Sequence, residues 1–155
     1  MCRGVERGHN ARMTGLFEPT PRPSGRDAIL IAAYERAGRT LDDLPYTKEF
    51  TQLHDDVRLH EPHALQADVF HRLQNLRKAG KLPKLGRGHS TPPAIRQDEE
   101  EFLAQIVIDA CGTLGQRDQL LYTPKFDDLV HAFNARTQRA LSPHDVWRLI
   151  AKIAK

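Results

Sequence analysis

Apolar residues recur at the three- and four-residue spacing of amphipathic helices along most of this chain. The pattern predicts helices that cover residues 27–37, 47–59, 67–79 and 98–111, and two more that begin after Thr123 and Ser142. Patterns typical of strands are nearly absent. The one short candidate, residues 81–85, contains Pro83, which favours an edge strand or an extended strap. We therefore expect an all-α fold with at most a vestigial strand.

Residues that cap helices support these boundaries. Thr47, Thr123 and Ser142 carry hydroxyl groups that can accept a hydrogen bond at a helix N-terminus. Thr123 and Ser142 are each followed by proline, which favours the first position of a helix. Gly80 and Gly112 follow the expected ends of two helices, where a left-handed residue often stops the helix.

The second half of the chain repeats the first at a separation of 76 or 77 residues. At 76, Asp42, Leu44, Tyr46, Thr47, Phe50 and Leu53 recur as Asp118, Leu120, Tyr122, Thr123, Phe126 and Leu129. At 77, Asp68, Val69 and Phe70 align with Asp145, Val146 and Trp147. The repeat predicts two tandem, duplicated three-helix units of the helix-turn-helix kind. Units of about 50–60 residues are at the lower limit for independent folding, so we expect the two to pack together.

The predicted organisation has four parts. A basic tail of residues 1–26, rich in proline and glycine and without periodicity, is expected to be disordered. The first unit covers residues 27–85, residues 86–97 form a linker, and the second unit covers residues 98–155. Met13 is an alternative start, because the residues before it show no structural pattern.

Composition narrows the class of protein. Hydrophobic residues make up 39% of the 155 residues and charged residues 28%, which is typical of a soluble globular protein. No apolar run approaches the ~18 residues of a membrane helix, and the N-terminus lacks the apolar segment of a secretory signal. Cys2 and Cys111 cannot form a disulfide framework. We therefore expect a cytoplasmic protein with no membrane partner.

Charge alternates in blocks along the chain. Residues 1–26, 27–68, 69–97, 98–128 and 129–155 carry net charges of +3, −5, +7, −6 and +4. Single-sign regions of this kind favour the steering of a charged partner, although neighbouring blocks can also neutralise one another within a fold.

Two tandem three-helix units that each end in a basic helix are the arrangement expected of tandem helix-turn-helix DNA-binding domains, in which the last helix enters the major groove. If Val69, Leu73 and Leu76 face the core, Arg72 and Asn75 face outward. Arginine and asparagine read the edges of guanine and adenine with two hydrogen bonds each.

Residues 76–82, Leu-Arg-Lys-Ala-Gly-Lys-Leu, resemble the junction between recognition helix and wing in winged-helix domains. A complete wing needs a second strand, and the linker offers none. The residues expected to contact DNA are His71, Arg72, Asn75, Arg77, Lys78, Lys81, Lys84 and Arg87 from the first unit and its strap, and Arg136, Arg139, Arg148, Lys152 and Lys155 from the second.

The sequence therefore predicts a non-enzymatic protein that binds double-stranded DNA, as a regulator or an accessory factor of a mobile element. The alternative is a helical adaptor whose basic helices dock an acidic protein partner, and the acidic faces could also hold a protein. The sequence leaves open the DNA site, the oligomeric state and whether both repeats bind.

Catalytic and metal-binding patterns are absent from the sequence. No glycine-rich phosphate loop and no nucleophile elbow occurs. Asp55-Asp56 and Asp127-Asp128 are adjacent on predicted helices, so their carboxylates point about 100° apart. His60 and His63 flank Pro62, and no cysteine pairs with them at zinc-like spacing. We expect no cofactor, no metal, an inert core thiol at Cys111 and a core role for Trp147.

Overall fold

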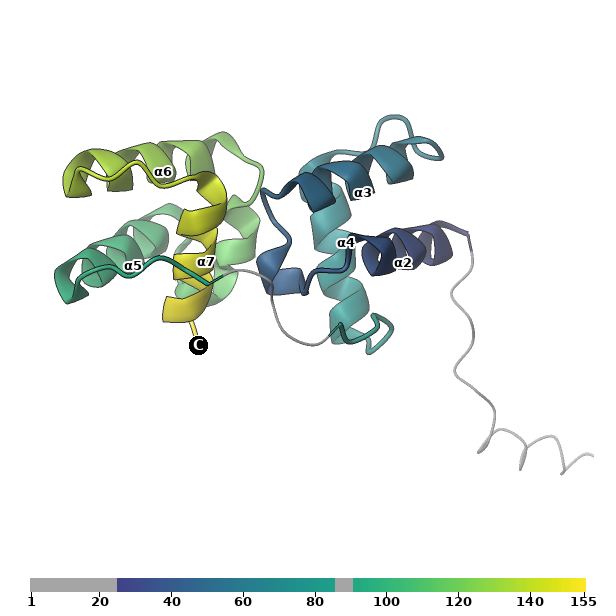
Figure 1. Cartoon of the computed structure of the whole chain (residues 1–155), viewed down its shortest axis with the longest axis horizontal. Coiled ribbons are helices and arrows are strands. Elements are labelled where there is room, and N and C mark those ends of the chain that lie inside the picture. The colour runs from purple at the N-terminus through teal and green to yellow at the C-terminus, as the bar shows by residue number, and fades with distance from the viewer. Residues whose placement is uncertain (1–24, 86–90) are drawn as a thin grey trace, which may run out of the picture.

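The computed structural model describes residues 25–85 and 91–155, and every regular element in those two ranges is a helix (Figure 1). The elements are α2 (Arg26–Ala37), η1 (Leu41–Asp43), α3 (Lys48–Arg58), α4 (Gln66–Lys78), α5 (Gln97–Cys111), η2 (Leu114–Leu120), α6 (Pro124–Thr137) and α7 (Pro143–Ile153). The all-α prediction is confirmed. Residues 81–85 form no strand.

Two short 3-10 helices, η1 and η2, were not predicted from the sequence. Each lies between the first and second α-helix of its half of the chain, so the order of elements in residues 26–78 recurs in residues 97–153. This order agrees with the predicted repeat, and the duplication itself stays an interpretation. The predicted tail lies almost wholly outside the described residues, as does the first part of the predicted linker.

The helix caps follow the sequence at two of the three predicted sites. The hydroxyl oxygen of Thr47 accepts a hydrogen bond from the backbone N–H of Phe50 at 3.1 Å. The hydroxyl of Ser142 accepts one from the N–H of Asp145, also at 3.1 Å. Thr123 makes no cap bond, although its hydroxyl donates to the carbonyl oxygen of Leu120 just as that of Thr47 donates to Leu44.

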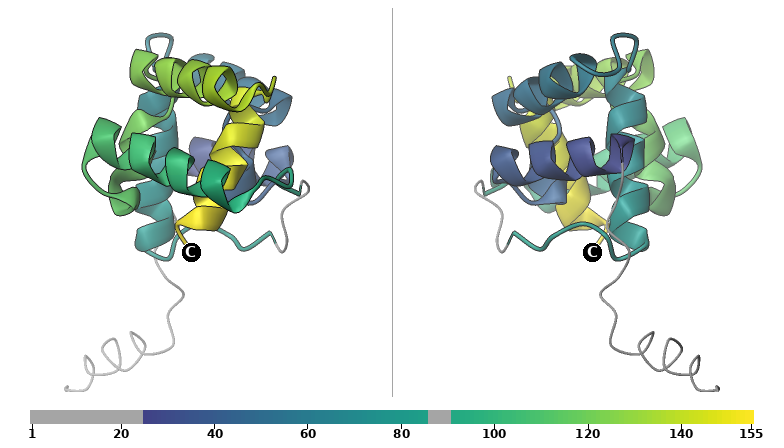
Figure 2. Two further views of the ribbon diagram at one scale, coloured as in Figure 1. Left: turned by 90° about the vertical axis from the view of Figure 1, so that its left-hand side faces the viewer. Right: turned by 90° about the vertical axis from the view of Figure 1, so that its right-hand side faces the viewer.

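Each half has two helices side by side and a third that crosses them (Figure 2). In the first half α4 crosses α2 and α3, and in the second half α7 crosses α5 and α6. The apolar faces of all six helices form the core. Its largest fully buried side chains include Trp147, Phe50, Phe70, Phe126 and Phe133. The core position predicted for Trp147 is confirmed, since 1% of its surface is exposed.

The two halves contact one another directly through α7 and η1. The indole N–H of Trp147 donates to the backbone carbonyl of Asp42 at 2.9 Å. A ring nitrogen of His144 lies 2.9 Å from the carbonyl oxygen of Pro45. Within the described ranges, no helix combines the length and the apolar character that crossing a bilayer requires.

Candidate nucleic-acid interface

Helix α4 has the orientation that the sequence predicted. Val69 and Leu73 are fully buried and Leu76 is 6% exposed. Phe70 and Gln74 widen this buried face. The helix is therefore anchored along one side, and its opposite side is available to solvent.

The exposed side of α4 carries His71, Asn75 and Lys78, which we call the α4 stripe. Their spacing of four and three residues places the three side chains on one helix face. Within residues 25–85 and 91–155, none of the three side chains forms a hydrogen bond or an ion pair. The three side chains thus have no hydrogen-bond partner in the described ranges, although the positive charge of Lys78 acts on the carboxylate of Asp118 in η2.

Arg72 lies on α4 beside the stripe but is engaged within the protein. Its guanidinium donates to both carboxylate oxygens of Glu61 at 3.1 Å, and its side chain is 20% exposed. Burial alone would raise the pKa of Glu61, but hydrogen bonds from Arg26 and Arg72 outweigh it and lower that pKa. Arg72 therefore fixes the start of α2 and the loop before α4.

The segment after α4 extends the basic surface. Leu82 and Leu85 pack against the core, which holds this strap on the protein. Lys81 and Lys84 are exposed, and neither forms an ion pair with any residue of the described ranges. Arg87, which the sequence added to this group, lies outside the described residues.

Arg77 stands at the end of α4 with a partly exposed side chain. Its guanidinium lies 3.6 Å from a carboxylate oxygen of Asp42 and also donates to Gln74 at 2.8 Å. On the other side of Asp42, the ammonium of Lys155 lies 4.0 Å from the second carboxylate oxygen. We call this group, Arg77, Asp42 and Lys155, the Asp42 junction. It lies where the C-terminal ends of α4 and α7 point to the same side of the molecule (Figure 1).

The basic residues of α7 face acidic groups. The guanidinium of Arg148 lies 3.4 Å from the carboxylate of Asp43, and its side chain is only 15% exposed. The ammonium of Lys152, which is more exposed, lies 3.9 Å from the carboxylate of Glu100. Arg148 and Lys152 of α7 thus each lie near an acidic group of the same chain, and only Arg148 is largely buried.

Asp43 is a buried carboxylate that sequence reasoning missed. It is fully buried and receives the guanidinium of Arg39 at 2.7 Å, with the ring of His144 at 3.5 Å and Arg148 nearby. Its neighbour Asp42 belongs to the repeated positions, but nothing in the pattern distinguished a buried acid from an exposed one.

Two further predicted contacts, Arg136 and Arg139, lie on or just after α6. Arg139 donates to both carboxylate oxygens of Glu99 at 2.8 Å. Arg136 is exposed, and its guanidinium lies 4.8 Å from the centre of the Phe102 ring. Neither residue joins the α4 stripe.

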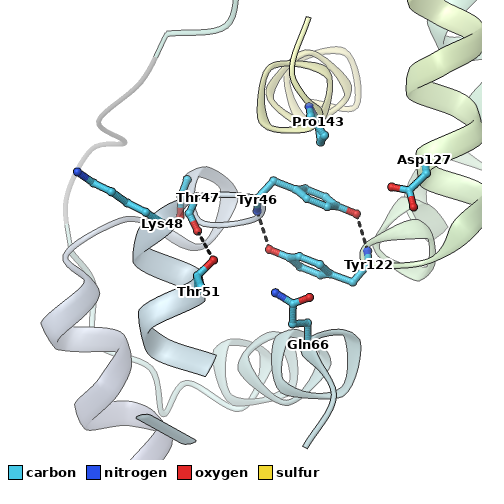
Figure 3. Close-up of a pocket in the computed structure, with 8 residues that line it drawn as sticks. All are labelled: Tyr46, Thr47, Lys48, Thr51, Gln66, Tyr122, Asp127 and Pro143. Atoms are coloured by element: carbon cyan, nitrogen blue, oxygen red, sulfur yellow. Dashed lines mark hydrogen bonds between the residues drawn. The ribbon is translucent and has the colours of Figure 1, made fainter. Parts of the chain in front are cut away.

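A hollow of about 490 Å³ lies where Tyr46 and Tyr122 stack between the halves (Figure 3). Lys48 and Asp127 also line it. Burial raises the pKa of Tyr46 to about 12, and each tyrosine hydroxyl accepts a hydrogen bond from the other residue's backbone. The tyrosines therefore join the halves and are poorly suited to act as bases.

The remaining side chains that could act as bases or nucleophiles contact nearby backbone carbonyls. A ring nitrogen of His54 lies 2.7 Å from the carbonyl oxygen of Ala64. The thiol of Cys111 is half-buried and donates to backbone carbonyls, and burial raises its pKa. In the part of the chain that the structure describes, no group of three or more His, Cys, Asp or Glu residues could hold a metal ion.

Comparison of this chain with protein-family models, with curated proteins and with solved structures finds no match.

Proposed function

We propose that this chain binds double-stranded DNA and places α4 in the major groove. The observation that carries the proposal is the α4 stripe, because His71, Asn75 and Lys78 are exposed on one face of a firmly anchored helix. Asparagine can pair with both hydrogen-bonding groups of adenine, and lysine can donate to the acceptors of guanine.

Phosphate contacts come from the lysines around the stripe. Lys81 and Lys84 extend from the strap, and Lys152 and Lys155 from α7 are more than half exposed. Contacts of this kind hold a protein in register on the duplex without reading sequence. Arg87 remains a predicted member of this group.

Three arginines of the predicted contact set have a different role in the proposal. Arg72, Arg139 and Arg148 are at most 29% exposed, and each is paired with a carboxylate. Arg77 is paired with Asp42 but is 46% exposed, so it can exchange that partner for phosphate. We propose that the first three arginines stabilise the fold and that Arg77 contacts phosphate.

Fluorescence anisotropy with a mixed duplex at several salt concentrations tests the proposal. We expect micromolar binding that weakens steeply with salt, with a log–log slope of about −0.9 per phosphate contacted. Lys81→Gln with Lys84→Gln should weaken binding and reduce that slope. The matched control is Lys48→Gln with Lys125→Gln, which removes the same charge from exposed positions on α3 and α6.

A helical adaptor for an acidic protein is the second candidate, because carboxylates already pair with Arg77, Lys152 and Lys155 within the chain. Absence of DNA binding at low salt would contradict the DNA proposal. A pull-down for acidic partners, compared between the chain and its Lys81→Gln, Lys84→Gln variant, would then test the adaptor.

A further inference from the structure

We infer that each chain reads bases with α4 alone, while α7 holds the two halves together and adds phosphate contacts. The inference rests on the proposed DNA binding. Each chain would then recognise a single half-site, which one helix reads in the major groove. A chain with two equal reading helices would instead recognise two half-sites.

The sequence by itself predicts two equal readers. At the separation of 77 residues, His71, Asn75 and Lys78 of α4 align with Arg148 and Lys152 of α7 and with Lys155, which follows the end of that helix. Both sets have the same spacing of four and three residues, which places the whole first set and, in the second, Arg148 and Lys152 on one helix face. We call Arg148, Lys152 and Lys155 the α7 stripe. The difference between them lies in what covers each stripe.

The α7 stripe is covered by the first half of the chain at Arg148, whereas Lys152 and Lys155 are 57% and 70% exposed. Arg148 lies against Asp43 and the carbonyl oxygen of Asp42, at 3.4 and 3.5 Å. Trp147, the preceding residue, is buried and donates to the same carbonyl at 2.9 Å. Helix α7 also packs on α5 and α6, so neighbours cover it on several sides.

This covering keeps the part of α7 around Trp147 and Arg148 out of a groove. An α-helix with its side chains is about 10–12 Å wide, and the major groove is about 12 Å wide. A helix can enter only where nothing else lies on its outer face. To free α7, the first half would have to detach from Trp147 and Arg148.

Two sequence differences explain why α4 escapes the same covering. Asp43 of η1, which is fully buried, corresponds to Gln119 of η2, which is exposed. Trp147 of α7 corresponds to Phe70 of α4, whose ring has no N–H to donate. The carboxylate of Asp43 and the indole of Trp147 therefore have no equivalents between α4 and η2, where the carboxylate of Asp118 interacts electrostatically with Arg77 and Lys78 at the end of α4.

The test is selection of a binding site from random duplexes with the full chain, followed by sedimentation to count chains per selected duplex. We expect one contiguous half-site per bound chain. Asn75→Ala and Lys152→Ala form a matched pair, because the two residues are equivalent in the repeat and both are exposed. Asn75→Ala should weaken binding to the selected duplex about tenfold or more, and binding to a mixed duplex only slightly. Lys152→Ala should weaken both duplexes equally.

Two half-sites per bound chain, about 10 base pairs apart, would overturn the inference, since α7 would then read bases as well. A selected motif that Lys152→Ala changes and Asn75→Ala does not would also overturn it. Binding without any base preference would overturn it while leaving the proposed DNA binding in place. No binding at low salt would overturn both.

Discussion

The backbone N–H groups of Tyr46 and Tyr122 each donate to the other residue's phenolic oxygen, at 2.6 Å in both directions. The two residues are 76 positions apart, their rings stack at 4.3 Å, and both have positive φ angles, 63° and 59°. Positive φ is uncommon for a bulky residue and stores strain. The reciprocal hydrogen bonds and the stacking offset that strain where the two halves meet.

We expect Tyr122→Phe to lower the free energy of unfolding by about 1–3 kcal/mol, because the partly buried N–H of Tyr46 would lose its acceptor. Tyr46→Phe should have a similar effect through the N–H of Tyr122. Both changes keep the aromatic ring, so packing is controlled within the experiment. Urea unfolding followed by circular dichroism measures the change, and a loss below about 0.5 kcal/mol for both variants would contradict a joining role for these bonds.

Alkaline pH should loosen the same contact. Burial raises the pKa of Tyr46 to about 12, and it raises the pKa of Tyr122 as well. A tyrosine has a pKa of about 10 in an unfolded chain. The stabilisation is therefore complete below pH ~10 and is lost as pH rises through about 12, because the unfolded state releases the protons first.

Absorbance titration at 295 nm, with and without denaturant, measures this difference. We expect the folded protein to ionise at a higher pH than the denatured chain, and the loss of stability above pH ~10 to be smaller in Tyr122→Phe. Coincident titration curves for the folded and denatured chains would show that the hydroxyls are exposed.

We expect acid to destabilise the folded chain by protonating Glu99. Hydrogen bonds from Arg139, and from the backbone of Arg96, lower the pKa of this carboxyl to about 2. An unfolded glutamate has a pKa of about 4.3. The stabilisation is present above pH ~4.3 and is lost as pH falls through about 2, because the unfolded state then binds the proton first.

Thermal unfolding between pH 2 and pH 6 checks this expectation. Glu99→Gln should lower the melting temperature at pH 6 and flatten its dependence on pH in the acid range. Glu101→Gln removes the same charge from an exposed position two residues away and serves as the control. Equal effects of the two substitutions would show that Glu99 contributes only to the net charge.

Local sequence patterns were enough to predict the α-helices and the face that each one buries. The spacing of Val69, Leu73 and Leu76 and the caps at Thr47 and Ser142 are signals within one or two turns, and all of them were correct. The 3-10 helices η1 and η2 were missed, because such short turns have no apolar periodicity.

The surroundings of the basic residues could not be predicted, because they depend on how the halves pack. Arg148 and Lys152 are both basic residues of one helix, yet Arg148 is 15% exposed and Lys152 is 57% exposed. Arg139 finds its carboxylate 40 residues away in Glu99. Ion pairs between distant segments depend on the tertiary arrangement. A repeat in the sequence does not specify that arrangement.

The Asp42 junction predicts that removing a negative charge will strengthen DNA binding. The carboxylate of Asp42 competes with phosphate for Arg77 and Lys155, which lie 3.6 and 4.0 Å from its two oxygens. Asp42→Asn should therefore raise affinity by about two- to tenfold at low salt and steepen the salt dependence by up to about 0.9 per added phosphate contact. The bond from Trp147 is made to the backbone carbonyl of Asp42 and survives the substitution.

Asp55→Asn is the control for Asp42→Asn, because Asp55 is an exposed acid on α3 and the change in net charge is the same. Anisotropy at three salt concentrations compares the two variants with the unchanged chain. A gain confined to Asp42→Asn would place phosphate at the ends of α4 and α7. Equal gains would reduce the effect to net charge. No gain in either variant would mean that Arg77 and Lys155 lie away from the duplex, and phosphate binding would then depend on Lys81 and Lys84.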